Sequence, residues 1–417
     1  MSSCRALCIT LETMKMRWFA ALLVVLASCY AGDWLSYRGD PQGTGWQRHG
    51  KALTVANVKN LKLLWKRQLD DRSLSSPVII GPTITHRGVR ELVFVAGAGD
   101  NLYAVDADLG TLFWKRHFDV GAKRQCFSGM PPTPVIEPDP DEDLSGDAVA
   151  DDEDDDEAGP MRPLYAVDSD GKLHTIRVSD GTDSNTPVNF MPSNASYSGL
   201  NFWSGTVYAA TYGGCGASDG LWSLDVGKAG AKRFFVPGKG GRGVVMGKTG
   251  AVDGDVALRY KGREFLVESD GPLHLLDAGN FSMAAEYRKP YTRYGVATYQ
   301  DSAGARWIYA ATEKNVMGFK ITGPSGGPRI ELAWTYDGPN ASRPAVTNGI
   351  VFVVIGPGVA DSSSTTLIAL DAATGKEIYS SGSVTYAYAP HPAIANGHVC
   401  FAGSGNTLYC FGIPLER

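Results

Sequence analysis

The sequence predicts an all-β fold, a single β-propeller of four-stranded blades, and three observations support this prediction. Fifty of the 417 residues are glycine, well above the usual share of about 7%. Glycine at this level, together with 18 Tyr, 15 Phe and 9 Trp, indicates many tight turns between aromatic-rich strands. A strand–turn–strand pattern also recurs along the chain at intervals of 45 to 65 residues, which is typical of propeller blades.

The repeat is clearest in two segments that align without a gap, Phe94–Val105 and Cys400–Phe411. Each contains two short strands around a Gly-rich turn, the pattern of a β-hairpin. Partial copies of the inner half occur at Leu221–Asp225, Leu273–Asp277 and Leu367–Asp371. First strands near residues 76, 133, 198, 243, 294, 343 and 391 predict seven blades, and eight are possible if one unit is degenerate.

The ring is predicted to close through its amino-terminal strand. The last unit ends at Tyr409–Phe411 with no fourth strand after it, whereas Leu61–Arg67 closely matches the fourth strand of the first unit, Thr111–Arg116. Pairing the early strand into the last blade would remove an exposed sheet edge. We therefore expect a lead-in segment at residues 29–60 and the propeller at residues 61–417.

The amino terminus has the pattern of a secretory signal peptide, placed at residues 1–28. Basic residues precede the apolar run Trp18–Leu26, and Met14 or Met16 is the expected initiator. The run ends in Leu-Ala-Ser-Cys, which resembles the bacterial lipobox, so Cys29 is the expected site of lipid attachment. The sequence thus predicts an exported protein.

Two destinations remain open for the exported chain. With Cys29 lipidated, Tyr30 rather than aspartate follows the anchor, and we expect an outer membrane lipoprotein that faces the periplasm. Ordinary cleavage after Ala31 would instead give a soluble periplasmic or secreted protein.

The charge of the chain is concentrated in one segment. Thirteen acidic residues and no Lys or Arg lie between Glu137 and Glu157, and without them the net charge of −5 becomes +8. A run of like charges with few apolar residues stays solvated. We predict a disordered acidic insertion at residues 137–160, inside the second blade. It is not expected to bind calcium, because Leu144 stands where a calcium loop needs glycine.

Four cysteines remain beyond the amino-terminal region. Cys400 and Cys410 flank the turn of the last hairpin, where an odd-length loop would place them opposite one another, within disulfide reach. Cys126 and Cys215 form a candidate pair by elimination only. Four buried thiols are the alternative.

Two turn-and-strand motifs resemble those of a known family. Asp106, Gly110 and Trp114 in one copy, and Asp371, Thr374 and Gly375 in another, look like the tryptophan-docking motif of quinoprotein-like (PQQ-repeat) propellers. Trp65 occupies the matching position of the amino-terminal strand. In that family the motif docks one blade on the next and does no chemistry. Departures are Leu109 for Thr and Tyr379 for Trp.

The resemblance implies two different functions. Lipoproteins of outer-membrane assembly share the repeat and the lipid anchor, which favours a non-catalytic scaffold that binds envelope proteins and uses no cofactor. The alternative is a periplasmic quinoprotein dehydrogenase that uses PQQ and calcium. A third hypothesis, sugar binding, depends on rim aromatics at Trp203, Tyr212, Tyr291 and Tyr294.

The residues favour the scaffold. The adjacent cysteine pair of the dehydrogenases is missing from the sequence, and the seven histidines lack metal-ligand spacing. His391 and His398 are expected to be turn or edge residues. We therefore predict no catalytic residues and no metal site, no nucleic-acid partner for an exported chain, and a monomer.

Overall fold

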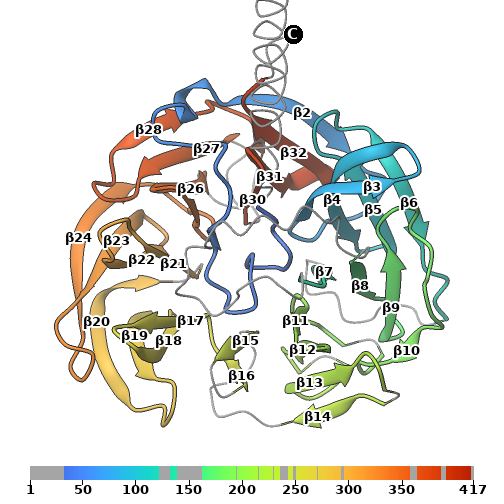
Figure 1. Ribbon diagram of the computed structural model, residues 1–417, viewed down its shortest axis with the longest axis horizontal. Coiled ribbons are helices and arrows are strands. Elements are labelled where there is room, and N and C mark those ends of the chain that lie inside the picture. The colour runs from blue at the N-terminus through green and yellow to red at the C-terminus, as the bar shows by residue number, and fades with distance from the viewer. Residues whose placement is uncertain are drawn as a thin grey trace, which may run out of the picture.

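The structure, a computed structural model, describes residues 32–121, 132–138, 162–193, 195–214, 216–228, 230–234, 243–247, 250–269, 271–292, 295–356, 364–386 and 391–414. Within these ranges almost all regular structure is β, with two short 3₁₀ segments, η1 (Val58–Asn60) and η2 (Ser404–Asn406). Seven sheets of at least four strands form a ring (Figure 1). The predicted all-β propeller of seven four-stranded blades is confirmed.

The first three blades follow the chain order. Blade one contains β3 (Val78–Thr85), β4 (Gly88–Gly97), β5 (Asn101–Asp106) and β6 (Leu112–His117). Blade two contains β7 (Val135–Ile136), β8 (Pro163–Val167), β9 (Lys172–Arg177) and β10 (Val188–Asn189). Blade three contains β11 (Asn201–Trp203), β12 (Thr206–Thr211), β13 (Gly220–Asp225) and β14 (Lys232–Phe234).

The next three blades repeat the same antiparallel order. Blade four contains β17 (Val256–Tyr260), β18 (Arg263–Glu268), β19 (Gly271–Asp277) and β20 (Met283–Thr292). Blade five contains β21 (Val296–Gln300), β22 (Arg306–Ala311), β23 (Asn315–Thr322) and β24 (Arg329–Asp337). Blade six contains β25 (Ala345–Thr347), β26 (Ile350–Ile355), β27 (Ser364–Asp371) and β28 (Glu377–Ser380), and it is extended by β1 (Trp46–Gln47) and β29 (Thr385–Tyr386).

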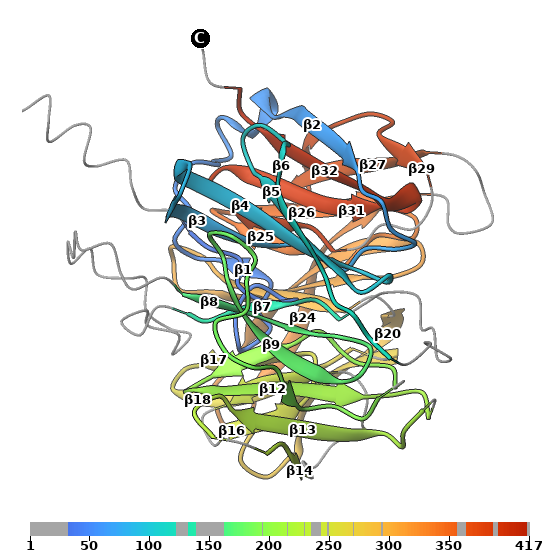
Figure 2. The same cartoon turned by 90° about the vertical axis from the view of Figure 1, so that its right-hand side faces the viewer.

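The closing blade joins the two ends of the chain, as predicted. It contains β30 (Ala393–Ala395), β31 (His398–Gly403) and β32 (Thr407–Gly412), and β2 (Lys62–Gln68) pairs antiparallel with β32. The side view shows β2 lying along β32 at one end of the molecule (Figure 2).

The boundary of the fourth unit differs from the prediction. The strand expected near residue 243 is β15 (Val244–Gly247), which pairs only with β16 (Gly250–Asp253), and blade four begins later, at β17. This hairpin still takes a place in the ring, because β15 contacts β11 on one side and β17 on the other. The innermost strands therefore form a closed circle of β3, β7, β11, β15, β17, β21, β25 and β30.

The core lies between neighbouring blades, so both faces of a central strand are buried. In β26, alternate side chains point to opposite faces. Ile350 and Phe352 join the cluster shared with the closing blade, whereas Val351 and Val353 join the cluster shared with blade five. Consecutive apolar residues in one strand are the result.

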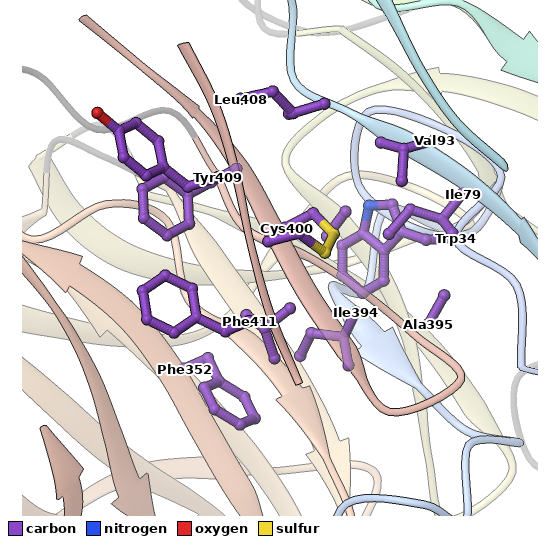
Figure 3. Packing of buried hydrophobic residues seen from close by; sticks show 14 of the residues in the cluster. Trp34, Ile79, Val93, Phe352, Ile394, Ala395, Cys400, Leu408, Tyr409 and Phe411 are labelled. Carbon is purple, nitrogen blue, oxygen red and sulfur yellow. A yellow bond between two sulfur atoms is a disulfide. The ribbon is translucent and has the colours of Figure 1, made fainter. Parts of the chain in front are cut away.

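A disulfide crosses the closing blade. Cys400 of β31 and Cys410 of β32 are directly opposite in register and are joined by a disulfide, with their Cα atoms 4.1 Å apart. Both residues are fully buried in the cluster shown in Figure 3, beside Phe411 and Ile394.

Candidate functional site in the central channel

The lead-in segment runs through the centre of the ring. Residues 33–47, which we call the channel strap, are all buried or half-buried, and Figure 1 shows this blue segment encircled by the blades. Trp34 exchanges two backbone hydrogen bonds with Ile79 of β3, at 2.9 and 2.8 Å. Near the other end, β1 pairs parallel with β25.

The strap is hydrogen-bonded to every innermost strand. Its backbone carbonyls accept hydrogen bonds in chain order as it passes from β7 round to β25, from Ile136, Asn201, Met246, Ala257, Thr298 and Val346, at 2.7–2.9 Å. The Gln47 side chain completes the circle by donating to the carbonyl of Ile394 in β30, at 3.5 Å. The strap therefore fills the channel and ties the inner strands together.

Glycine is required where the strap passes closest to the blades. Gly43 has φ +70°, and a Cβ there would lie 2.9 Å from the carbonyl oxygen of Asp255. Gly45 has φ +64°, and a Cβ would lie 3.0 Å from that of Ala297. A side chain at either position would strain the backbone and push the strap away from the wall.

A buried polar cluster lies where the strap meets β17 and β25. Nη2 of Arg38 in the strap and Nη2 of Arg343 are 3.6 and 3.5 Å from Oδ1 of Asp255. Both guanidinium groups also lie over the ring of Tyr37, at 5.7 and 5.6 Å. The other carboxylate oxygen of Asp255 accepts hydrogen bonds from the backbone and hydroxyl of Ser269.

Burial controls the protonation of this cluster. Desolvation, followed by the charge of Arg343, lowers the pKa of Arg38 to about 10. Burial, followed by the charges of Arg343 and Arg38, holds the pKa of His391 well below its usual range. His391 is therefore neutral, and its Nδ1 accepts a hydrogen bond of 3.1 Å from the backbone N–H of Arg343. The arrangement can fix the strap, and it offers no nucleophile paired with a base among the described residues.

The residues of the predicted docking motif make contacts between neighbouring blades. The indole of Trp65 donates a 2.6 Å hydrogen bond to the carbonyl of Ala107 in blade one, and its ring covers Gly110. Oδ1 of Asp106 accepts from the backbone N–H groups of Asp108 and Leu109, at 3.1 and 2.9 Å. This bonding holds the turn on which Trp65 docks.

The second copy follows the same pattern with a tryptophan that sequence reasoning missed. Asp371 ties its turn through Thr374, whose backbone and hydroxyl donate to Oδ1 at 2.9 and 2.7 Å. The docking indole is that of Trp334 in blade five, which covers Gly375 and donates to Ala372 at 3.0 Å. The sequence signal that could have identified Trp334 is that it is the only tryptophan of β24, as Trp65 is of β2.

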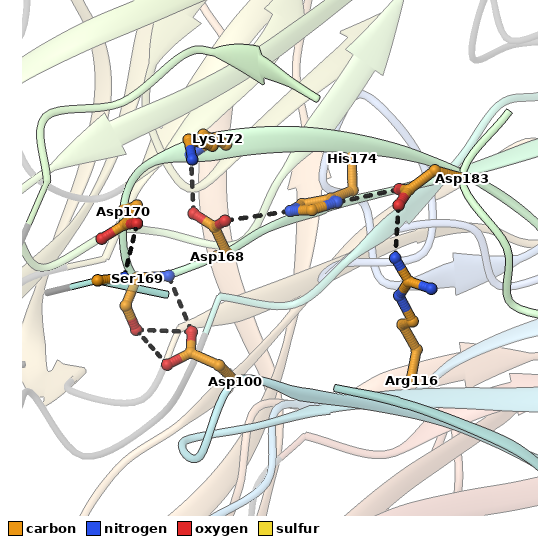
Figure 4. A network of polar contacts seen from close by, with 9 residues as sticks. Asp100, Arg116, Asp168, Ser169, Asp170, Lys172, His174 and Asp183 are labelled. Atoms are coloured by element: carbon orange, nitrogen blue, oxygen red, sulfur yellow. Dashed lines mark hydrogen bonds and ion pairs between the residues drawn. The ribbon is translucent and has the colours of Figure 1, made fainter. Parts of the chain in front are cut away.

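Trp114 docks in the same manner on blade two. Its indole donates to the carbonyl of Val178, at 2.8 Å, and its ring covers Gly181. The junction is extended by a polar network (Figure 4), in which His174 lies between Asp168 and Asp183, at 3.1 and 3.0 Å. Trp203, one of the aromatic residues predicted at the rim, packs against a buried cluster that blade three shares with the β15–β16 hairpin.

The last two histidines lie beside the turn of the closing blade, His391 half-buried and His398 buried. His391 belongs to the channel cluster described above. His398 is only 7% exposed, and its ring lies between two carboxylates of blade one. Both residues face neighbouring parts of the ring, a long-range arrangement that their position near a turn does not reveal.

Several predicted features lie outside the described residues. These are the signal peptide, Cys29, Cys126, Cys215 and most of the acidic insertion at 137–160. In the ranges that are described, no helix is long and apolar enough to cross a membrane.

Comparisons with known proteins match the fold alone. No family model and no curated protein sequence matches the chain. A quinohemoprotein alcohol dehydrogenase from Comamonas testosteroni aligns with a TM-score of 0.57 and 13% identity, over 93% of this chain and 81% of that one. A europium-containing methanol dehydrogenase aligns with a TM-score of 0.58 and 11% identity, over 91% of this chain and 98% of that one. BamB from Moraxella catarrhalis aligns with a TM-score of 0.42 and 14% identity, over 86% of this chain and 99% of that one.

Proposed function

We propose that this protein is a non-catalytic scaffold of the bacterial envelope, which binds other envelope proteins through the outer surface of its propeller. One observation carries the proposal. The channel, where propellers can hold a small molecule, is filled by the strap, which is hydrogen-bonded to all of the inner strands. Functional contacts are then left to the blade edges and loops, where partner proteins bind.

The donor set in the channel does not suit the alternative, a dehydrogenase that uses PQQ and calcium. Calcium takes about 6–8 oxygen ligands. Among the described channel residues, Asp255 is already engaged by Ser269 and faces two guanidinium groups. A cation placed beside Arg38 and Arg343 would be repelled. We therefore assign no catalytic step to this site.

Titration with PQQ, with and without calcium, tests this choice. We expect no saturable heat with the purified mature protein and no dehydrogenase activity with an artificial electron acceptor. Calcium-dependent binding tighter than about 10 µM, roughly 7 kcal/mol of binding free energy, would overturn the scaffold assignment. A variant with Asp255→Asn would then show whether the binding depends on the channel.

A lipid anchor at Cys29 would orient the scaffold. Only two residues separate Cys29 from Gly32, where the described chain begins, so the anchor would lie within about 11 Å of Gly32, at the Asp33 end of the strap. That face of the ring would rest near the membrane, and the opposite face would meet partners. Metabolic labelling with a palmitate analogue tests this, because Cys29→Ala should abolish both the label and membrane recovery. A labelled Cys29→Ala protein would contradict it.

A further inference from the structure

A group of three potential metal ligands lies at the junction between blade one and the closing blade. Glu91 is at the start of β4, Asp108 is in the turn on which Trp65 docks, and His398 begins β31. One ligand atom from each of the three lies within 4.8 Å of those of the other two. The group is outside the channel and has no part in the function proposed above.

Two of the ligand atoms are buried without a hydrogen bond. The side chains of Glu91 and His398 are only 8% and 9% exposed, and Oε2 of the carboxylate is 3.0 Å from Nδ1 of the imidazole. Their approach does not meet hydrogen-bond geometry, and neither atom has another partner. Two ligands of a Zn²⁺ ion, each about 2.1 Å from the metal, are separated by about 3.0–3.4 Å. The observed spacing suits a shared ion.

Asp108 contributes a second negative charge and an exposed side of the group, which solvent can reach. Asp108 Oδ1 is 3.4 Å from Nε2, the other ring nitrogen of His398, and its side chain is 58% exposed, so it can turn toward an ion held on Nδ1 and leaves a path from solvent beside it. Two ionised carboxylates carry a charge of −2, which a divalent cation would balance in place of the proton on His398. Imidazole with carboxylate ligands favours Zn²⁺ and similar transition ions over Ca²⁺.

His174 provides an instructive contrast. Figure 4 shows that it too has one carboxylate at each ring nitrogen, Asp168 and Asp183, but these three residues do not bring three ligand atoms within 4.8 Å of one another. Among the described residues, only the group around His398 brings three potential ligand atoms together.

We propose that Glu91, Asp108 and His398 bind one divalent transition-metal ion of the Zn²⁺ class, which fastens blade one to the closing blade. Water would complete the coordination on the exposed side of Asp108. The competing occupant is a proton on His398, held by the same two carboxylates, and the experiment must separate the two.

Calorimetric titration of chelator-treated mature protein with ZnCl₂ tests the proposal. We expect one ion per chain with a Kd of about 10 µM or tighter, and weaker binding of CaCl₂. Asp108→Asn and His398→Gln should each weaken binding by about tenfold or more. His274→Gln is the matched control, because that imidazole also lies between two carboxylates, 3.8 Å from Glu268 and 3.3 Å from Glu286, and it should leave binding unchanged.

The two test variants also guard against misfolding and against other acidic sites. Asp108→Asn changes an exposed side chain and should keep the wild-type circular dichroism spectrum, so loss of binding would not reflect unfolding. Absence of saturable Zn²⁺ binding to the wild-type chain would overturn the proposal and leave a protonated His398 in the site. Binding that survives both substitutions would also overturn it, by placing the ion elsewhere, for example on the acidic run.

Discussion

Replacing Gly110 by alanine should loosen the junction between the closing blade and blade one. Gly110 lies beneath the indole of Trp65, which comes from the amino-terminal strand that closes the ring. The substitution therefore challenges the docking contact itself. Gly405→Ala is the matched control, because Gly405 has nearly the same backbone conformation in an open turn.

The expected loss follows from two contributions at Gly110. Its φ is +65°, and a non-glycine residue in that region costs about 1–2 kcal/mol. A Cβ would lie 2.5 Å from two atoms of the indole, and such overpacking costs about 1–3 kcal/mol. Displacement of Trp65 would also remove its bond to Ala107, worth about 0.5–1.5 kcal/mol. We expect about 3–6 kcal/mol in total.

The control variant, Gly405→Ala, should show only the cost of placing a non-glycine residue at positive φ. Gly405 has φ +70°, and a Cβ added there would meet nothing within 4 Å, so alanine at this position should cost about 1–2 kcal/mol. Denaturant midpoints followed by circular dichroism, at a common slope, measure both losses. In a Trp65→Ala background, Gly110→Ala should fall to the control value. Equal losses for the two glycine variants, or an unchanged loss without the indole, would refute the reasoning.

Three further predictions concern buried groups. Asp255→Asn should lower the free energy of unfolding by about 3–5 kcal/mol, since two buried guanidinium groups lose their shared carboxylate, whereas the exposed Asp225→Asn should leave the denaturant midpoint unchanged. Replacing Cys400 and Cys410 by alanine should cost about 3 kcal/mol for a disulfide that spans 10 residues, and should abolish the effect of reductant on the midpoint. The pKa of His391 is lower in the folded than in the unfolded chain, so its contribution to the free energy of unfolding is complete above about pH 6.5 and is lost as the pH drops below that value. His391→Asn should therefore reduce the fall in unfolding free energy between pH 7 and 5.5 by about 1 kcal/mol. The same fall in the wild type and in the variant would contradict this.

The blades could be predicted because each is a local repeat, in which turn residues and apolar strands follow one another along the chain. The fourth boundary was misplaced for the same reason. The hairpin that begins at Val244 has the alternation of any two blade strands, and nothing local shows that a third strand fails to pair with it.

The channel and the ring-closure group could not be predicted in this way. The strap meets eight separate strands, six of them through backbone hydrogen bonds alone, and such bonds leave no periodic pattern in side chains. Similarly, His398 lies 307 residues from Glu91 in sequence, and only the closure of the ring brings the two together.

The course of the strap also sets the order in which the molecule can be completed. A segment that precedes every blade in sequence lies along the axis, and its partners extend from Ile79 to Ile394. Contacts so distant in sequence form slowly, and among the described strands β2 pairs only with β32, the last of them. These early residues thus form an axis to which each innermost strand is hydrogen-bonded. A chain that ends before β32 would lack the strand that pairs with β2, so the ring can close only in chains that contain β32.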